Sequence, residues 1–251
     1  MGQVVTLYFL PGMMCDERLF SSQITDLSPH YACHIVEFNT GDSIEQYARL
    51  VIDSRLQHAD ESVGDSKSVL VGLSMGGIVA MECLRQAPHL FDALILMDTN
   101  PLAEDSSRQR LRPPQIKRAL DGELETILID EMKPLYLAPA NRSNETLLAL
   151  VLHMAKQLGP EVFAQQSKAL MNRVDSSEVL SMWDKPALVM HGEYDSLCPP
   201  ERHTLMHKLM TQSELHEIPD AGHLPTLEAP TVVNDTLFAF LEALFTKPSN
   251  D

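Results

Sequence analysis

The chain has 251 residues, of which 44% are hydrophobic and 22% are charged, a composition typical of a folded globular protein rather than a disordered one. Its 19 Lys and Arg residues against 35 Asp and Glu residues give a formal net charge of −16, which disfavours binding to nucleic acid and to anionic lipid surfaces. No apolar run approaches the ~18 residues of a membrane-spanning helix. From the charge and from this observation together, we expect neither a nucleic-acid partner nor a membrane partner.

The cysteines are few and have no CxxC or metal-ligand spacing; they are Cys15, Cys33, Cys83 and Cys198. We interpret them as reduced thiols of a cytoplasmic protein, since the first residues lack the features of a secretion signal. The sequence contains no P-loop, no GxGxxG and no HExxH motif. We therefore expect no cofactor and no metal.

Apolar runs alternate with helical periods through the first hundred residues. The pattern predicts strands at residues 4–10, 33–38, 68–73 and 93–97, and helices at 44–56 and 78–85. Ser43 is placed to cap the first of these helices. Such alternation is typical of βαβ units, and it indicates an α/β fold with a mostly parallel, twisted sheet flanked by helices.

The rhythm changes between residues 101 and 183. Helical periods at 116–132, 146–157 and 162–171 follow one another without a strand, and Pro113-Pro114, Pro139 and Gly159-Pro160 are expected to separate them. Strands at 187–191 and 214–218 and helices at 201–210 and 231–245 then resume the alternation. The sequence thus predicts a core formed by residues 1–100 and 184–251, with a helical cap of residues 101–183 inserted into it.

The run GLSMGG at residues 72–77 matches the GxSxG motif at a predicted strand-to-helix turn. A sharp turn of this kind forces Ser74 into a strained backbone conformation and leaves no room for side chains at Gly72 and Gly76. It also places the Ser74 hydroxyl above the N-terminus of a helix, where free N–H groups favour negative charge. Ser74 is therefore the candidate nucleophile.

A hydroxyl needs a base to act as a nucleophile, and His223 is the strongest candidate. It lies in the sequence PDAGH, in the loop after the last predicted strand. His191 is the main rival, although its place at a strand end favours packing or capping. His203 and His207 have helical spacing but no evident third ligand, so we interpret them as part of a solvated helix face.

A carboxylate is needed to hold the tautomer of the histidine. Asp195, in HGEYD at residues 191–195, follows the preceding predicted strand, so that its loop and the His223 loop reach the same edge of a parallel sheet. Asp98 follows the strand after the serine turn and is an alternative acid, and Glu193 is a weaker one. The order Ser74, Asp195, His223 along the chain differs from the orders of the two well-known serine-protease groups.

With these residues the sequence resembles the α/β-hydrolase superfamily, and within it the small bacterial esterases and enol-lactonase-like serine hydrolases. The resemblance extends over nearly the whole chain and rests on LPGM at 10–13, the serine turn, HGEYD at 191–195 and AGHLPTLEAP at 221–230. It implies an α/β-hydrolase fold, a Ser-His-Asp triad and a nucleophile elbow. It is specific for the fold and less specific for the reaction.

The resemblance also implies an oxyanion hole made of two main-chain N–H groups. One belongs to the residue after the nucleophile, here Met75, and the other to the loop after the first strand, where Met13 is the candidate donor. Members of the family often have His-Gly in that loop, whereas this chain has Pro11-Gly12, which removes a side chain that commonly braces it. The antiparallel strands that open the family's sheet are also expected to be missing.

The function predicted on this basis is hydrolysis of a small carboxylic ester or lactone through an acyl-enzyme. The same triad also serves perhydrolases, acyltransferases and carbon–carbon bond hydrolases, and a ligand-binding receptor-like protein on the same fold is the non-enzyme alternative. We expect a small-molecule substrate and a monomer or homodimer. The natural substrate and the cap residues that line its pocket do not follow from the sequence.

Overall fold

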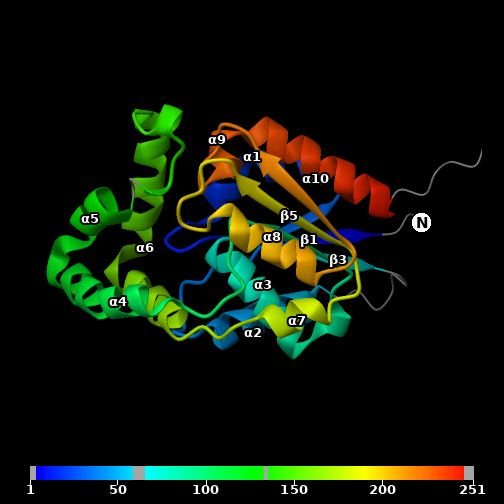
Figure 1. The fold of residues 1–251 in the computed structure, drawn as a ribbon, viewed down its shortest axis with the longest axis horizontal. Coiled ribbons are helices and arrows are strands. Elements are labelled where there is room, and N and C mark those ends of the chain that lie inside the picture. The colour runs from blue at the N-terminus through cyan, green and yellow to red at the C-terminus, as the bar shows by residue number, and fades with distance from the viewer. Residues whose placement is uncertain (1–3, 59–65, 133–134, 246–251) are drawn as a thin grey trace, which may run out of the picture.

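The computed structural model describes residues 4–58, 66–132 and 135–245. Within these residues the centre of the molecule is a sheet of six parallel strands in the order β2-β1-β3-β4-β5-β6 (Figure 1). The strands are β1 Val5–Leu10, β2 Ala32–Ile35, β3 Lys67–Leu73, β4 Ala93–Met97, β5 Ala187–Gly192 and β6 Ser213–Ile218. This arrangement confirms the predicted fold class.

The four central strands are runs of buried residues, as expected for strands covered on both faces by helices. Helices α2 Ile44–Gln57, α3 Met75–Gln86 and α7 Ser177–Ser181 lie on one face, and α1 Ser21–Leu27 and α10 Pro230–Phe245 lie on the other (Figure 1). The predicted cap of α2 is present, since the Ser43 side chain accepts a hydrogen bond from the N–H of Gln46.

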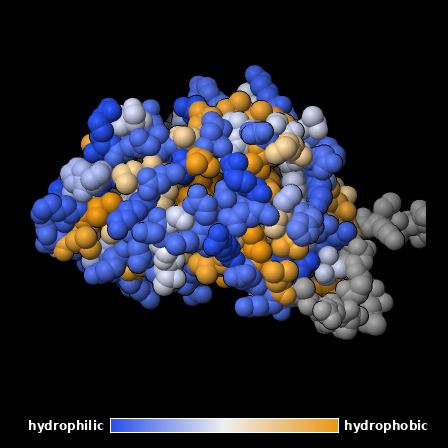
Figure 2. Space-filling model, turned by 90° about the horizontal axis from the view of Figure 1, so that it is seen from below, coloured by the Kyte–Doolittle hydropathy of each residue, from blue (hydrophilic) through white to orange (hydrophobic). Residues whose placement is uncertain are grey.

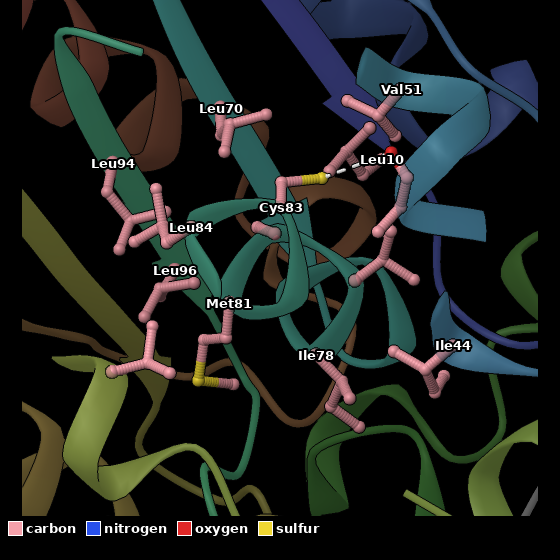
Figure 3. Packing of buried hydrophobic residues seen from close by; sticks show 14 of the residues in the cluster. Leu10, Ile44, Val51, Leu70, Ile78, Met81, Cys83, Leu84, Leu94 and Leu96 are labelled. Atoms are coloured by element: carbon pink, nitrogen blue, oxygen red, sulfur yellow. Dashed lines mark hydrogen bonds between the residues drawn. The ribbon is translucent and has the colours of Figure 1, made fainter. Parts of the chain in front are cut away.

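The core around α3 fixes the position of this helix against the sheet. Ile78, Met81 and Leu84 of α3 lie among apolar side chains of the neighbouring strands and α2 (Figure 3). The Cys83 thiol turns toward α2, where it donates to the main-chain oxygen of Ala48 at 3.7 Å. Because α3 begins directly after β3, this packing also fixes the turn between them.

Strand register brings the ends of the central strands to one edge of the sheet. Leu10 pairs with Gly72, Leu73 pairs with Met97, and Met97 pairs with Met190. The loops that follow β1, β3, β4 and β5 therefore leave the sheet side by side. In a parallel sheet this carboxyl edge is where ligands bind.

The remaining helices are α4 Ser106–Arg118, α5 Leu124–Ile127, α6 Glu145–Met171, α8 Pro200–Leu209 and α9 Pro225–Glu228. Single turns of 3₁₀ or π helix occur at Glu17–Phe20, Pro88–Leu90, Ala119–Glu123, Leu128–Met132 and Pro139–Asn141. Helices α4, α5 and α6 stand together beyond the carboxyl edge of the sheet (Figure 1). Among the described residues between β4 and β5 there is no strand.

Two proline positions behave differently from each other. Pro113 and Pro114 do not separate helices as the sequence predicts, but lie inside α4. Both are exposed, so water can reach the carbonyl groups that proline leaves unpaired, and the helix continues. At Gly159-Pro160 the helical path does break, because Gly159 has φ of 84° inside α6, between the two helices that the sequence predicts there.

Hydrophilic side chains cover most of the face shown in Figure 2, with smaller hydrophobic areas between them. In the part of the chain that the structure describes, none of the helices combines the length and the apolar character needed to cross a membrane.

Candidate active site

Ser74 occupies a strained turn between β3 and α3. Its φ of 54° and ψ of −116° lie in a region that residues other than glycine rarely adopt. Its main-chain N–H donates to the oxygen of Met97 at 2.9 Å, and its own carbonyl accepts from the N–H of Gly77 and from the Thr99 hydroxyl. The turn is therefore held by the last residue of the neighbouring strand β4, by Thr99 just after it and by its own helix, and the hydroxyl is left at the carboxyl edge.

Steric crowding explains why the turn has glycine at positions 72 and 76. A Cβ atom at Gly72 would lie 2.5 Å from the main-chain oxygen of Gly76, and one at Gly76 would lie 1.8 Å from that of Leu10. Neither neighbour can move easily, because Leu10 belongs to the central strand β1. Glycine at both positions thus allows α3 to approach the sheet directly after Ser74.

His223 and Asp195 meet Ser74 at this edge. His223 Nε2 lies 2.9 Å from Ser74 Oγ, and its Nδ1 lies 2.9 Å from Asp195 Oδ2. The tautomer that satisfies both contacts has Nδ1–H donating to Asp195 and the Ser74 hydroxyl donating to Nε2. Both His223 and Asp195 are buried. The geometry allows a proton to pass from the hydroxyl to the imidazole.

The backbone beside His223 is held by a residue from the helical segment. The main-chain N–H of His223 donates to the oxygen of Tyr136 at 2.8 Å, and the two rings stack with centroids 6.0 Å apart. Glu228 accepts from the N–H groups of Gly222 and Ala138, which ties the same two segments together. Sequence reasoning misses Tyr136, because no motif marks it and it lies far from His223 along the chain.

Asp195 is held in the ionised form. Its Oδ1 accepts from the N–H groups of Leu197 and Cys198 at 2.8 and 3.0 Å. Burial opposes the charge, but the adjacent His223 and these hydrogen bonds together hold the pKa of Asp195 below its usual value. A negative carboxylate beside Nδ1 stabilises an imidazolium.

Asp98, the alternative acid, lies behind Asp195 rather than on His223. Its Oδ1 accepts from the N–H of Gly192 at 2.8 Å, and no N–H or O–H of another described residue donates to its Oδ2. Burial, followed by the negative charge of Asp195, raises the pKa of Asp98 well above its usual value. Its carboxyl therefore holds a proton more readily than an exposed aspartate does. Glu193 is exposed and accepts from the N–H of Asp220 instead.

Met13 and Met75, the two predicted oxyanion donors, lie in the segments that flank Ser74. Met75 is the first residue of α3, so its N–H has no partner within the helix. Met13 follows Gly12, at which a Cβ atom would lie 3.4 Å from that of Ser74. Among the described residues neither N–H donates to a protein atom, whereas the N–H of the next residue, Met14, donates to Gln166 at 2.8 Å. Gln166 fixes this loop.

The other histidines of the region are structural. His191 is buried and stacks on His203 with ring centroids 4.7 Å apart. The interpretation of His203 as part of a solvated face is wrong, because it is fully buried in α8 and its Nε2 accepts from the N–H of Thr99 at 3.1 Å. His207 is not paired with it and contacts the Ser213 hydroxyl.

The burial of His203 predicts an acid-sensitive fold. Burial, and then the neighbouring His191, lower its pKa from 6.5 to about 3. Between these values the unfolded chain binds more protons than the folded one, so the free energy of unfolding falls as the pH falls below 6.5, by up to about 1.4 kcal/mol per unit. In His203→Gln the amide oxygen still accepts from Thr99 but does not titrate. Denaturant unfolding at pH 7.0 and 5.5 should show a smaller loss of stability in this variant than in the wild type. An equal loss in both would assign the acid sensitivity to other groups.

A metal ion fits this site poorly. Asp195, Cys198 and His223 offer ligand atoms within 4.8 Å of one another. However, His223 and Asp195 already bind each other, and burial, followed by the charges of Asp195 and Asp98, raises the pKa of the Cys198 thiol well above its usual value. A thiol must lose its proton to bind a metal, so the arrangement disfavours a metal centre.

Ser74 and His223 line a cavity of about 240 Å³ at the carboxyl edge. The sheet loops contribute Gly12, Met13 and Thr99 to its wall, among others. The helical segment contributes residues to which no sequence motif points: Arg108, Leu111, Arg112, Gln115, Glu131, Met132, Leu135, Tyr136, Leu170 and Arg173.

The sequence matches the model of the alpha/beta hydrolase family over residues 7–236. The chain belongs to this family. A curated relative, the pimeloyl-[acyl-carrier protein] methyl ester esterase of Sodalis glossinidius, is 24% identical over 235 residues, covering 89% of this chain and 88% of the relative. The corresponding protein of Photobacterium profundum is also 24% identical and covers 96% of both chains.

Solved structures agree with this assignment. A thermophilic esterase from Thermogutta terrifontis superposes with a TM-score of 0.85 at 25% identity, covering 98% of this chain and 92% of that one. The enol-lactonase of Burkholderia xenovorans superposes with a TM-score of 0.82 at 18% identity, covering 96% and 92%. The expected resemblance to small bacterial esterases of this family is thus confirmed.

Proposed function

We propose that this α/β hydrolase is a serine esterase that cleaves a small carboxylic ester or lactone through an acyl-enzyme. The observation that carries the proposal is the continuous hydrogen-bonded series from Ser74 Oγ through His223 to Asp195, with 2.9 Å at each contact. The names of the curated relatives and of the Thermogutta terrifontis structure, which are esterases, support the same reaction class.

In the proposed mechanism His223 takes the proton from Ser74 as the hydroxyl oxygen attacks the ester carbonyl. The carbonyl oxygen becomes negative and is bound by the N–H groups of Met13 and Met75. Asp195 stabilises the imidazolium, which then protonates the leaving alcohol. Water repeats the cycle on the acylated Ser74 and releases the acid.

We further propose that the helical segment, residues 101–183, acts as the cap of the site. Support comes from the share of the cavity wall that it contributes and from Tyr136, whose carbonyl and ring hold His223. A cavity of about 240 Å³ suits a small substrate. The methyl ester in the names of the curated relatives supports a small leaving alcohol.

Steady-state hydrolysis in the absence of any acceptor tests this function. The purified protein should turn over p-nitrophenyl acetate and at least one of a series of lactones with saturation kinetics, and a fluorophosphonate probe should label it in equimolar amount. Labelling without turnover would favour a ligand-binding role. Acyl release that requires an added alcohol or peroxide would favour a transferase or perhydrolase.

A further inference from the structure

Helix α4 is strongly basic although the chain carries a net charge of −16. Its sequence, SSRQRLRPPQIKR, contains no acidic residue. Four of its residues line the cavity next to Ser74, and they follow the spacing i, i+3, i+4, i+7 that marks one helix face: Arg108, Leu111, Arg112 and Gln115. The helix therefore turns two guanidinium groups toward the proposed substrate site.

Arg173 contributes a third guanidinium to the cavity wall. The three cations have fewer carboxylate partners than charges. Arg112 and Arg173 both donate to the same oxygen of Glu104, each at 2.9 Å, and the Glu104 side chain has no exposed surface. One carboxylate thus serves two cations. Burial lowers the pKa of Arg173, and although Glu104 opposes this, the charges of Arg112 and Arg108 add to it.

No close ion pair holds Arg108 among the described residues: the Asp105 carboxylate interacts with its charge without a salt bridge, and its guanidinium donates to the main-chain oxygen of Leu197 at 3.3 Å. The one acidic side chain among those lining the cavity, Glu131, is already bound by Gln115 and Arg118. The wall of the cavity therefore holds a surplus of positive charge in an acidic protein.

This surplus of positive charge lies close to the proposed catalytic residues. Arg112 Nη1 is 3.8 Å from the Met13 sulfur, beside the proposed oxyanion loop. Arg108 donates to the main-chain oxygen of Leu197, and the N–H of Leu197 donates to Asp195. A small substrate that reaches Ser74 with its ester carbonyl therefore meets the guanidinium groups with its other end.

We propose that the substrate carries a carboxylate a few bonds away from the scissile ester, and that Arg108 and Arg112, backed by Arg173, bind it. This inference rests on the proposed function and narrows it to half-esters of short dicarboxylic acids or to lactones that bear a carboxyl group. The planar, fork-like guanidinium matches the two oxygens of a carboxylate, and the side chains of Arg112 and Arg173 are only 13% and 7% exposed. Hydrolysis of such a half-ester consumes one water and yields the diacid and the alcohol.

The test compares three methyl esters by acid release in a pH-stat at low salt. Monomethyl adipate carries the carboxylate, its primary amide is a neutral match, and methyl 5-phosphonopentanoate replaces the carboxylate by a phosphonate on a chain of the same length. We expect kcat/KM for monomethyl adipate to exceed that for the amide by about tenfold, mainly through KM. Raising the salt to 0.5 M should reduce the preference, because screening weakens the ion pairs.

Arg108→Gln should lower the ratio of kcat/KM between monomethyl adipate and its amide severalfold. The matched control is Arg110→Gln, on the same helix but outside the cavity lining, and it should keep the wild-type ratio. An equal ratio in wild type and Arg108→Gln, or a preference for the amide or the phosphonate, would overturn the carboxylate assignment. If none of the esters is hydrolysed, the proposed function fails instead, and adipate titrated calorimetrically into wild type and Arg108→Gln then decides whether the anion site exists.

Discussion

Ser74→Ala is expected to lower kcat for p-nitrophenyl acetate by about 10⁴-fold or more. The methyl group leaves no oxygen to attack the carbonyl, and His223 and Asp195 then have no proton to transfer. The main-chain N–H groups of Met13 and Met75 remain, so slow hydrolysis by water above the uncatalysed rate should persist. Fluorophosphonate labelling should disappear together with the turnover. Stopped assays at high enzyme concentration measure the residual rate.

A control must separate loss of the nucleophile from loss of the fold. Ser181→Ala removes an exposed hydroxyl from α7, far from the carboxyl edge, and should keep wild-type kinetics. Ser74→Ala should melt at or above the wild-type temperature, because alanine keeps the Cβ atom and the strained turn is held by main-chain bonds. Full activity in Ser74→Ala would remove Ser74 as the nucleophile, whatever its distance from His223.

Much of the sheet could be predicted from the sequence because its central strands are unbroken apolar runs. Residues 93–97 are such a run, and β4 has the same bounds. The turn at Ser74 is equally clear, since a serine directly after a buried strand, with glycine two residues away on each side, is typical of a strand that turns sharply into a helix. The parallel order then carries Asp195 and His223 to the same edge. Their positions agree with the prediction, and their catalytic roles stay a prediction.

The helical segment could not be predicted to the same depth. The sequence of this segment does not alternate between strands and helices. No strand order therefore fixes which of its helices faces Ser74. The face of α4 that reaches the cavity depends on packing against α6, and Tyr136 reaches His223 only through tertiary contact. The sequence carries one local signal of the cavity wall, which is the basic sequence of α4, because this helix contains no acidic residue in an otherwise acidic chain.

The choice between Asp195 and Asp98 required coordinates, because both follow strands at the correct edge. Replacing each by asparagine separates them, and Asp195→Asn should lower kcat by about 10⁴-fold. An amide at this position either repels Nδ1–H or stabilises the tautomer with its proton on Nε2, and in both cases His223 no longer accepts the proton of Ser74. Loss of the negative charge also leaves the imidazolium unpaired. Steady-state kinetics on p-nitrophenyl acetate measures both variants under the same conditions.

Asp98→Asn is the matched control and should cost less than about tenfold in kcat, because a carboxyl group and an amide have nearly the same shape and Asp195, not Asp98, contacts His223. The asparagine oxygen can still accept from the N–H of Gly192, and its NH₂ group can donate toward the neighbouring Asp195 carboxylate. Both substitutions thus replace a carboxylate oxygen by an NH₂ group in neighbouring side chains. They differ in that only Asp195→Asn removes the carboxylate that contacts His223. A large loss in Asp98→Asn with a small loss in Asp195→Asn would move the acid to Asp98, and it would require His223 to turn away from the carboxylate that it contacts at 2.9 Å.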